Sequence, residues 1–167
     1  MKINENVKTS PFKGHVLIKD KATNEILVDK FNAIHPQNMA LAIAKALAHE
    51  DGGYIYSLAL GNGGTFFTTA NELVYKSPNI IGASTLYNET YIEQVDEQDG
   101  ATPINNSVLA AISPSPANTA LIIVTFELDA TQPAGQALSD NISSTLDTPF
   151  SFDELGLKTQ DGLLLSH

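Results

Sequence analysis

One stretch of the chain, Ala120–Asp129 (ALIIVTFELD), is apolar almost without interruption and is the strongest strand signal in the sequence. A strand with one face in water alternates apolar and polar residues, whereas a continuous apolar run is typical of a strand that is covered on both faces. We therefore expect this segment to lie in the middle of a β-sandwich or sheet. Such a fold needs several further strands.

A β-hairpin is predicted near the start of the chain. His15–Asp20 and Glu25–Asn32 are β-rich runs joined by a short polar connection. Asn24, at the end of that connection, tolerates the positive φ that tight turns require. The two runs are therefore expected to pair with each other.

A second hairpin is predicted at the other end, where Phe150–Leu157 and Gly162–His167 flank the turn pair Asp161-Gly162. Strands thus occupy both ends of the chain. The further strand candidates are Tyr54–Leu60, Leu86–Val95 and the short segment Ser107–Ile112.

Only one long helix is predicted, at Pro36–His49, where Ala and Leu predominate. Pro36 suits the first helical turn, because its missing N–H is not needed there. Gly52 and Gly53 end the segment and permit a left-handed cap. The pattern predicts an antiparallel β-sandwich with one α-helix (about Pro36–His49) and long loops.

The chain has 167 residues, the size at which one hydrophobic core closes into one domain. The first thirteen residues are polar and carry Pro11, so we expect an N-terminal arm at 1–13 and a single β-rich domain at 14–167. The N-terminus lacks the apolar run of a secretion signal, and no stretch reaches the ~20 apolar residues of a membrane span. These features predict a soluble protein made in the cytoplasm.

Charge excludes two classes of partner. The net charge is −10, and all nine basic residues are Lys. Nucleic-acid surfaces and surfaces that bind anionic lipid depend on clustered Lys and Arg, so we expect neither partner here. There is no Cys, which excludes disulfides, thiolate nucleophiles and Cys-based metal sites.

The glycine-rich turn at Gly61, Asn62, Gly63 and Gly64 follows the strand Tyr54–Leu60 and invites comparison with phosphate-binding loops. A P-loop needs Lys and Ser or Thr opening a helix, but aromatic residues follow here. The dinucleotide fingerprint needs a third glycine where this chain has Phe. We therefore interpret the turn as a backbone feature that requires positive φ, and expect no cofactor.

Other catalytic and metal-binding patterns also fail. The four His residues lie far apart in sequence, and no Ser lies in G-x-S-x-G. The acidic turn Asp96–Asp99 departs from the EF-hand pattern, so a solvated turn is favoured and a bound calcium ion is left open. Asp153 and Glu154 are adjacent, and adjacent strand residues point to opposite faces, which disfavours joint action on one bond. We expect no catalytic residues, no metal site and no enzymatic activity.

The connection Phe66–Gly82 is long and shows no convincing period, and loops of this length usually have a function. It carries much apolar surface for a loop, which either folds back on the core or packs against another subunit. The candidate subunit-interface residues are Phe66, Phe67, Val74, Tyr75, Ile80 and Ile81.

Four stretches in order resemble a module of tailed-bacteriophage virion proteins, including the N-terminal parts of tail-collar fibre proteins. They are LALGNGGT at 58–65, LYNETY at 86–91, FELDATQPAGQ at 126–136 and FDELGL…DGLLLSH at 152–167. The chain departs from that family in two ways. Ile92 and Glu93 follow Tyr91 where the family often has a basic residue. Fibre proteins continue into long repetitive shafts, whereas this sequence stops at His167, so we expect a stand-alone virion component.

The resemblance implies a non-enzymatic structural component of the virion. Its expected form is a homo-oligomeric ring or collar subunit of the neck, connector or tail that contacts other virion proteins. One alternative is a capsid decoration (cement) protein. Another is a β-sandwich carbohydrate-binding module, although the chain has no Trp to form a sugar platform. The candidate sugar-stacking residues for that alternative are Tyr54, Tyr56, Tyr87 and Tyr91.

Overall fold

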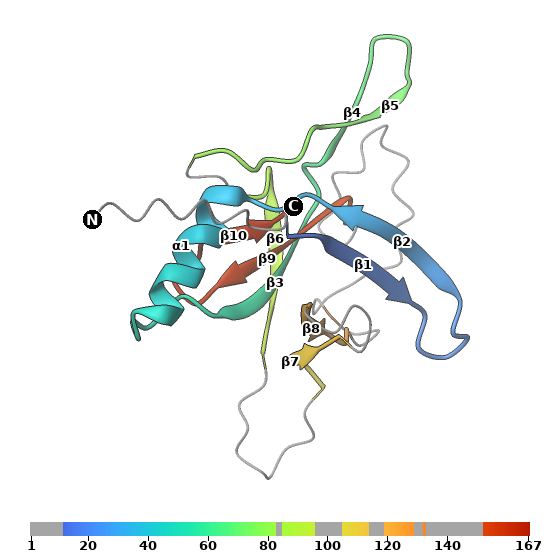
Figure 1. The fold of residues 1–167 in the computed structure, drawn as a ribbon. Helices are drawn as coiled ribbons and strands as arrows, with labels where there is room; N and C mark the ends of the chain where they lie inside the picture. Colours follow the sequence, from blue (N-terminus) through green and yellow to red (C-terminus); the bar gives the residue numbers. More distant parts are fainter. Residues whose placement is uncertain (1–11, 83–84, 96–104, 114–118, 129–131, 133–151) are drawn as a thin grey trace.

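The computed structural model describes residues 12–82, 85–95, 105–113, 119–128, 132 and 152–167. It is mainly β with one helix, and every described strand pairing is antiparallel, which confirms the predicted fold class (Figure 1). In chain order the elements are β1 (Gly14–Lys19), β2 (Ile26–Asn32), α1 (Pro36–Leu47), β3 (Ile55–Gly61), β4 (Thr65–Phe67), β5 (Leu73–Tyr75), β6 (Glu89–Gln94), β7 (Ser107–Ile112), β8 (Ala120–Thr125), β9 (Glu154–Thr159) and β10 (Leu164–Ser166).

A four-stranded sheet in the order β10-β9-β3-β6 forms the centre of the fold. β3 lies between β9 and β6, and its residue Leu60 is in register with Leu155 on one side and Tyr91 on the other. The two separate strand candidates Tyr54–Leu60 and Leu86–Val95 thus pair with each other through β3 and β6. Ala59, Leu86 and Leu164 form the buried centre of the core against this sheet.

Helix α1 packs beside β10. Its N-cap is His35, whose ring nitrogen accepts a hydrogen bond from the Asn38 N–H, and Pro36 occupies the first turn as predicted. The Asn38 side chain donates to the Leu164 carbonyl at 2.9 Å. The helix ends two residues earlier than expected, because a left-handed residue at His49 (φ 59°) and another at Gly52 (φ 87°) turn the chain back.

Both predicted terminal hairpins are present. β1 and β2 pair across a turn in which Asn24 has a φ of 59°. β9 and β10 pair across a turn in which Gly162 has a φ of 81°, although β9 continues two residues beyond the predicted Leu157. Local turn chemistry was therefore sufficient to find both hairpins.

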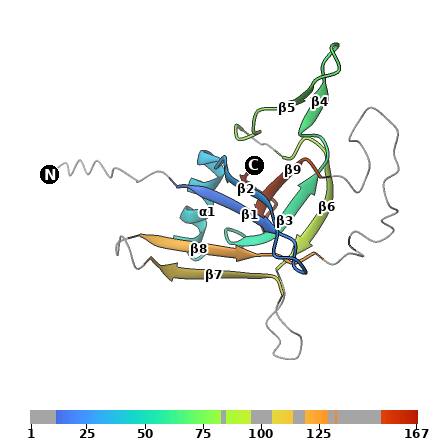
Figure 2. The same cartoon turned by 90° about the vertical axis from the view of Figure 1, so that its right-hand side faces the viewer.

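The connection Phe66–Gly82 was expected to lack regular structure, and this was wrong. Thr65–Phe67 and Leu73–Tyr75 pair as the short hairpin β4–β5, with Asn71 at a φ of 61° near its turn. Strands of three residues are too short to show a period in sequence. We call Thr65–Tyr75 the arm, because it projects from the body of the molecule in two perpendicular views (Figures 1 and 2).

The strand at Ala120 exists, but its predicted position in the middle of a sandwich was wrong for the single chain. β8 pairs with β7 in a separate two-stranded sheet, at the end of the molecule opposite the arm (Figure 2). Its side chains are largely exposed, with Ile122 at 57%. The apolar run therefore predicted burial that one copy of the chain does not supply.

Several predictions fall outside the described residues. These are the N-terminal segment 1–13 apart from its last two residues, the acidic turn Asp96–Asp99, and residues 129–136 of the FELDATQPAGQ stretch apart from Gln132. The division into an N-terminal segment at 1–13 and a single domain at 14–167 stays a prediction.

Candidate functional site

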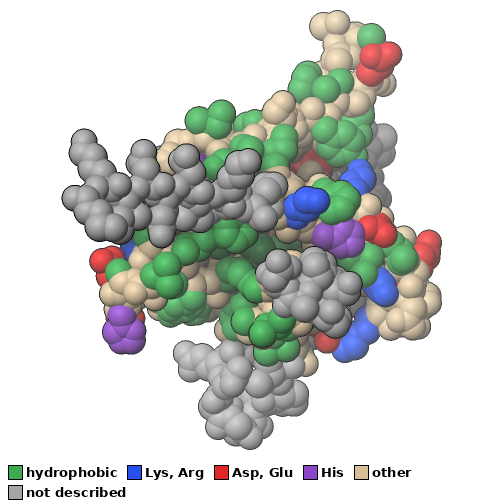
Figure 3. All heavy atoms as spheres, viewed as in Figure 1, with side chains coloured by type: hydrophobic (Ala, Val, Ile, Leu, Met, Phe, Trp, Pro, Cys, Tyr) green, Lys and Arg blue, Asp and Glu red, His purple; other side chains and the backbone are tan. Residues whose placement is uncertain are grey.

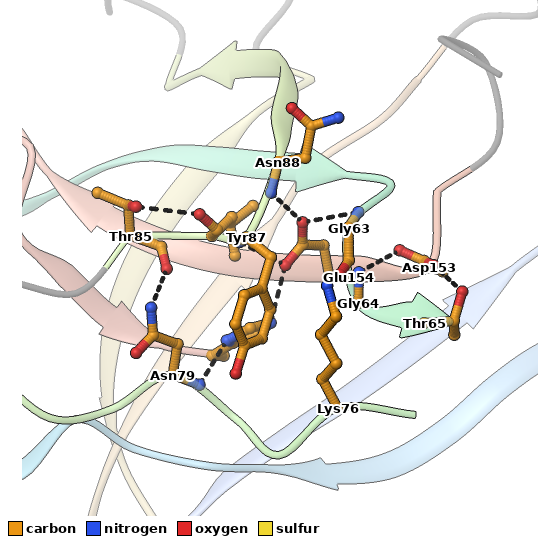
Figure 4. A network of polar contacts seen from close by, with 12 residues as sticks. Gly63, Gly64, Thr65, Lys76, Asn79, Thr85, Tyr87, Asn88, Asp153 and Glu154 are labelled. Carbon is orange, nitrogen blue, oxygen red and sulfur yellow. Dashed lines mark hydrogen bonds and ion pairs between the residues drawn. The ribbon is translucent and has the colours of Figure 1, made fainter. Parts of the chain in front are cut away.

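The glycine turn Gly61–Gly64 lies where three segments of the central sheet meet. It follows β3, faces Tyr87 and Asn88 just before β6, and abuts Asp153 and Glu154 at the start of β9 (Figure 4). A network of hydrogen bonds joins the three segments. We call this network the glycine-turn clamp.

Both neighbouring carboxylates bind the turn. Asp153 accepts a hydrogen bond from the Gly64 N–H at 2.8 Å and another from the Thr65 hydroxyl. Glu154 accepts from the Gly63 N–H at 3.0 Å. The expectation that these two side chains point apart was wrong, because Asp153 precedes the first residue of β9 and strand alternation does not extend to it.

Glu154 is the centre of the clamp. Its Oε1 atom also accepts from the Asn88 N–H at 2.8 Å, and its Oε2 atom accepts from the Tyr87 N–H at 2.9 Å and lies 3.2 Å from the Nε2 atom of His167. The Glu154 side chain is 1% exposed. A buried carboxylate is tolerated when hydrogen-bond donors surround it in this way.

Burial alone would raise the pKa of the Glu154 carboxyl, since it disfavours the charged form. The hydrogen bonds from His167, Asn88, Tyr87 and Gly63 favour the charged form and outweigh burial. Together they lower the pKa of Glu154 from 4.5 to about 2. The clamp therefore depends on an ionised carboxylate.

The turn glycines are required for close approach and not for positive φ, which corrects the interpretation from sequence. The described glycines with positive φ are Gly52, Gly82 and Gly162. A Cβ atom on Gly61 would lie 2.5 Å from both the Asn88 carbonyl oxygen and a Glu154 carboxylate oxygen. The missing side chains are what allow the three segments to meet.

Replacing Gly61 with Ala should therefore destabilise the protein by about 3 kcal/mol, because the added methyl group meets backbone and a fully engaged carboxylate. Urea unfolding measures the loss. Gly82→Ala is the matched control, since its Cβ would meet nothing within 4 Å and only its φ of 68° opposes the change, at about 1 kcal/mol. Equal costs at the two positions would contradict a steric role for Gly61.

Two buried histidines hold the connection that returns from the arm to the core. The Asn79 N–H donates to Nδ1 of His167 at 2.8 Å, so the proton of a neutral His167 lies on Nε2, facing Glu154. His35, which is fully buried, places Nε2 3.0 Å from the Gly82 carbonyl oxygen. The spacing of histidines in a sequence can indicate metal ligands, but it carries no signal for hydrogen bonds to a distant part of the backbone, so the sequence did not predict this role.

The arm is fixed at both of its ends. On one side the clamp holds Gly64 and Thr65, as described above. On the other, the Lys76 N–H donates to the Gly64 carbonyl at 2.8 Å, and its ammonium group donates to the Gly63 carbonyl at 2.6 Å. That ammonium group also lies 4.6 Å from the centre of the Tyr87 ring. The network thus gives the arm a rigid root.

The clamp offers little to a ligand. The N–H groups of Gly63 and Gly64 already bind carboxylates, so the turn has no donors left there for a phosphate group. Among the described residues, no three His, Asp or Glu side chains are placed to hold a metal ion. A hollow of about 340 Å³ lies elsewhere, between residues 12–14 and 31–34, and is lined by no carboxylate or imidazole group.

The six candidate interface residues occupy the arm and the connection after it. Phe66 is 48% exposed, Tyr75 67% and Ile81 86%, and Phe67 is also exposed. Val74 and Ile80 are partly exposed. The four exposed side chains do not fold back into the core, which was one of the two alternatives. Their burial against another subunit stays a prediction.

The four tyrosines considered for sugar stacking are not buried. Tyr54 and Tyr87 are exposed, and Tyr54 meets Tyr56 edge to face, with ring centres 6.3 Å apart. The Tyr54 hydroxyl donates to the Gln160 side chain and the Tyr56 hydroxyl to the Gln94 side chain. The Tyr87 hydroxyl donates to the Ser77 carbonyl. Burial and the nearby Glu93 carboxylate raise the pKa of Tyr91 to about 12.

No protein-family model matches the chain, and no curated protein or solved structure is significantly similar to it. Within the described residues, no helix is both long and apolar enough to cross a membrane.

Proposed function

We propose that this protein is a non-enzymatic structural subunit of a tailed-bacteriophage virion. It forms a ring or collar with copies of itself in the neck, connector or tail, and contacts other virion proteins. It uses no cofactor and binds neither nucleic acid nor membrane.

The observation that carries this proposal is the imbalance between buried and exposed apolar side chains. Among the described residues, only six hydrophobic side chains are buried, and two of these are Ala42 and Ala59. In the same described part of the chain, twenty-three large hydrophobic side chains are exposed. Figure 3 makes this visible, with apolar side chains spread over the face that it displays. So large an excess of exposed over buried apolar side chains supports a surface that other chains cover.

The glycine-turn clamp supports the proposal by giving the resembling stretches one shared place in the fold. Three of the four stretches that carry the resemblance meet there: LALGNGGT through Gly63, LYNETY through Tyr87 and Asn88, and the C-terminal stretch through Glu154 and His167. Their shared role is to hold the root of an exposed apolar arm. A rigidly held arm suits a subunit that must meet its neighbours in one fixed orientation.

The sugar-binding alternative keeps one supporting feature, the edge-to-face pair of the exposed Tyr54 and the partly exposed Tyr56. The hydroxyls of both rings already bond to glutamine side chains, Gln160 and Gln94, and the rings stand edge to face instead of forming one flat platform. The assembly proposal therefore accounts for more of the surface.

Native mass spectrometry of the purified protein tests the proposal. We expect a closed homo-oligomer, on the order of six to twelve copies, with no lower species that persists at micromolar concentration. A trimer or a monomer would favour the capsid-decoration alternative. A persistent monomer that binds host glycans on an array would overturn the assembly proposal.

A further inference from the structure

A ring of more than two subunits needs two different surfaces on each copy, because every subunit contacts one neighbour with one surface and the next neighbour with another. The two surfaces must be complementary and must lie on different sides of the subunit. The inference below rests on the proposed function and names the described elements that form these two surfaces.

The arm supplies one candidate surface. Its two strands expose Phe66, Phe67, Leu73 and Tyr75. Between Thr65 and Tyr75 the sequence has a single charge, Glu72, which lies near the turn of the hairpin. The arm is thus an apolar projection with a fixed root.

The β7–β8 hairpin supplies the other. Its twelve strand residues, SVLAAI and ALIIVT, include no charged side chain. Alternation along the strands places Leu109 and Ile123 on one face and Ile112 and Ile122 on the other. All four are exposed, Ile112 by 78%. A two-stranded hairpin with apolar side chains on both faces is not stable in water by itself.

The near absence of charge on both surfaces suits a second copy of this chain as the partner. Each copy carries a net charge of −10, so two copies repel each other wherever acidic surfaces meet. The β7–β8 strands carry no charge and the arm only one, so these are surfaces through which like-charged copies approach at small electrostatic cost.

Their positions suit head-to-tail contact. The arm and the β7–β8 hairpin lie at opposite ends of the molecule in both perpendicular views (Figures 1 and 2). The ties of β7–β8 to the rest of its own chain include polar contacts at its base, where Asn106 bonds to Glu93 at 2.7 Å and to the Glu127 N–H at 2.8 Å. Its apolar side chains Leu109, Ile112, Ile122 and Ile123 stay exposed.

We propose that the β4–β5 arm of one copy packs on the apolar β7–β8 hairpin of the next, so that the subunits associate head to tail. This contact supplies the burial that the continuous apolar run of β8 indicates. It also explains why the root of the arm is fixed by so many hydrogen bonds, since the angle of the arm sets the angle between neighbours.

Two complementary variants test the contact. Phe66→Asp places a charge on the arm, and Ile122→Asp places one on the hairpin. Each variant alone is expected to lose the ring and run as a monomer by native mass spectrometry. Mixed in equal amounts, they should form a heterodimer, because the intact hairpin of the first binds the intact arm of the second.

Circular dichroism checks that both variants are folded, and Tyr75→Asp and Leu109→Asp replace any variant that is not. Failure of the mixture to dimerise, or a ring that survives either substitution, would overturn the head-to-tail contact while leaving a wild-type ring in place. A wild-type protein that is monomeric would instead overturn the proposed function itself. The two failures are therefore distinguishable.

The lack of native Cys allows an independent measurement. A double variant with Tyr75→Cys and Ile112→Cys, treated with a flexible bismaleimide, should give a ladder of covalent oligomers on a denaturing gel. Each single variant should give no ladder. Dimers from either single variant would mean that like surfaces meet, which contradicts the head-to-tail arrangement.

Discussion

Glu154→Gln is expected to lower the free energy of unfolding by about 3 kcal/mol, as is usual when one partner is removed from a buried, hydrogen-bonded charge. The substitution keeps the size and shape of the side chain. It turns an NH₂ group toward backbone donors of Gly63, Tyr87 or Asn88, and it removes the negative charge beside His167. The loss therefore measures the charge and its hydrogen bonds, and not packing.

Urea unfolding at one fixed subunit concentration measures this loss, since assembly also stabilises the folded state. Glu25→Gln is the matched control, because Glu25 is exposed, and there we expect a change within about 0.5 kcal/mol. A cost at Glu154 no larger than that at Glu25 would show that the clamp contributes nothing to the fold.

The second large effect is a loss of stability in acid. The pKa of Glu154 is 4.5 without the fold and about 2 within it, so the folded state binds fewer protons than the unfolded state between these values. Its contribution is therefore complete above pH 4.5 and is lost as the pH falls toward 2. A shift of this size corresponds to about 3 kcal/mol.

The measurement is the free energy of unfolding of the wild type minus that of Glu154→Gln, at several pH values from 6 down to about 2. We expect this difference to shrink as the pH falls. The comparison is needed because other groups also titrate in this range, among them Asp20, whose pKa is lowered by hydrogen bonds from Thr23. A difference that stays constant with pH would contradict the role of the Glu154 charge.

The elements that sequence predicted well are those whose signals are local. Pro36 and the glycines after the helix mark α1, and the turn residues Asn24 and Gly162 mark two hairpins. In each case the residues that decide the structure lie within a few positions of the element that they define. Helix propensity and turn chemistry act at that range.

The clamp was missed because its members are distant in sequence. Gly63 and Glu154 are separated by 91 positions, and no spacing rule connects a glycine turn to a carboxylate so far along the chain. The position of β8 was misjudged for a related reason. An apolar run indicates that a strand is covered on both faces, but it does not say whether the same chain or another copy provides the cover.

The order of strands in the central sheet has a consequence for synthesis. β3 is made early, but it lies between β6 and β9, which are made later. β10 borders β9, and its Leu165 carbonyl accepts a hydrogen bond from the His35 N–H just before α1. The middle of the sheet therefore stays incomplete until Glu154–Ser166 has left the ribosome. During translation, the apolar surfaces that we propose for assembly are therefore not yet held in their final positions. The arm becomes rigid only after the C-terminal strands have completed the central sheet.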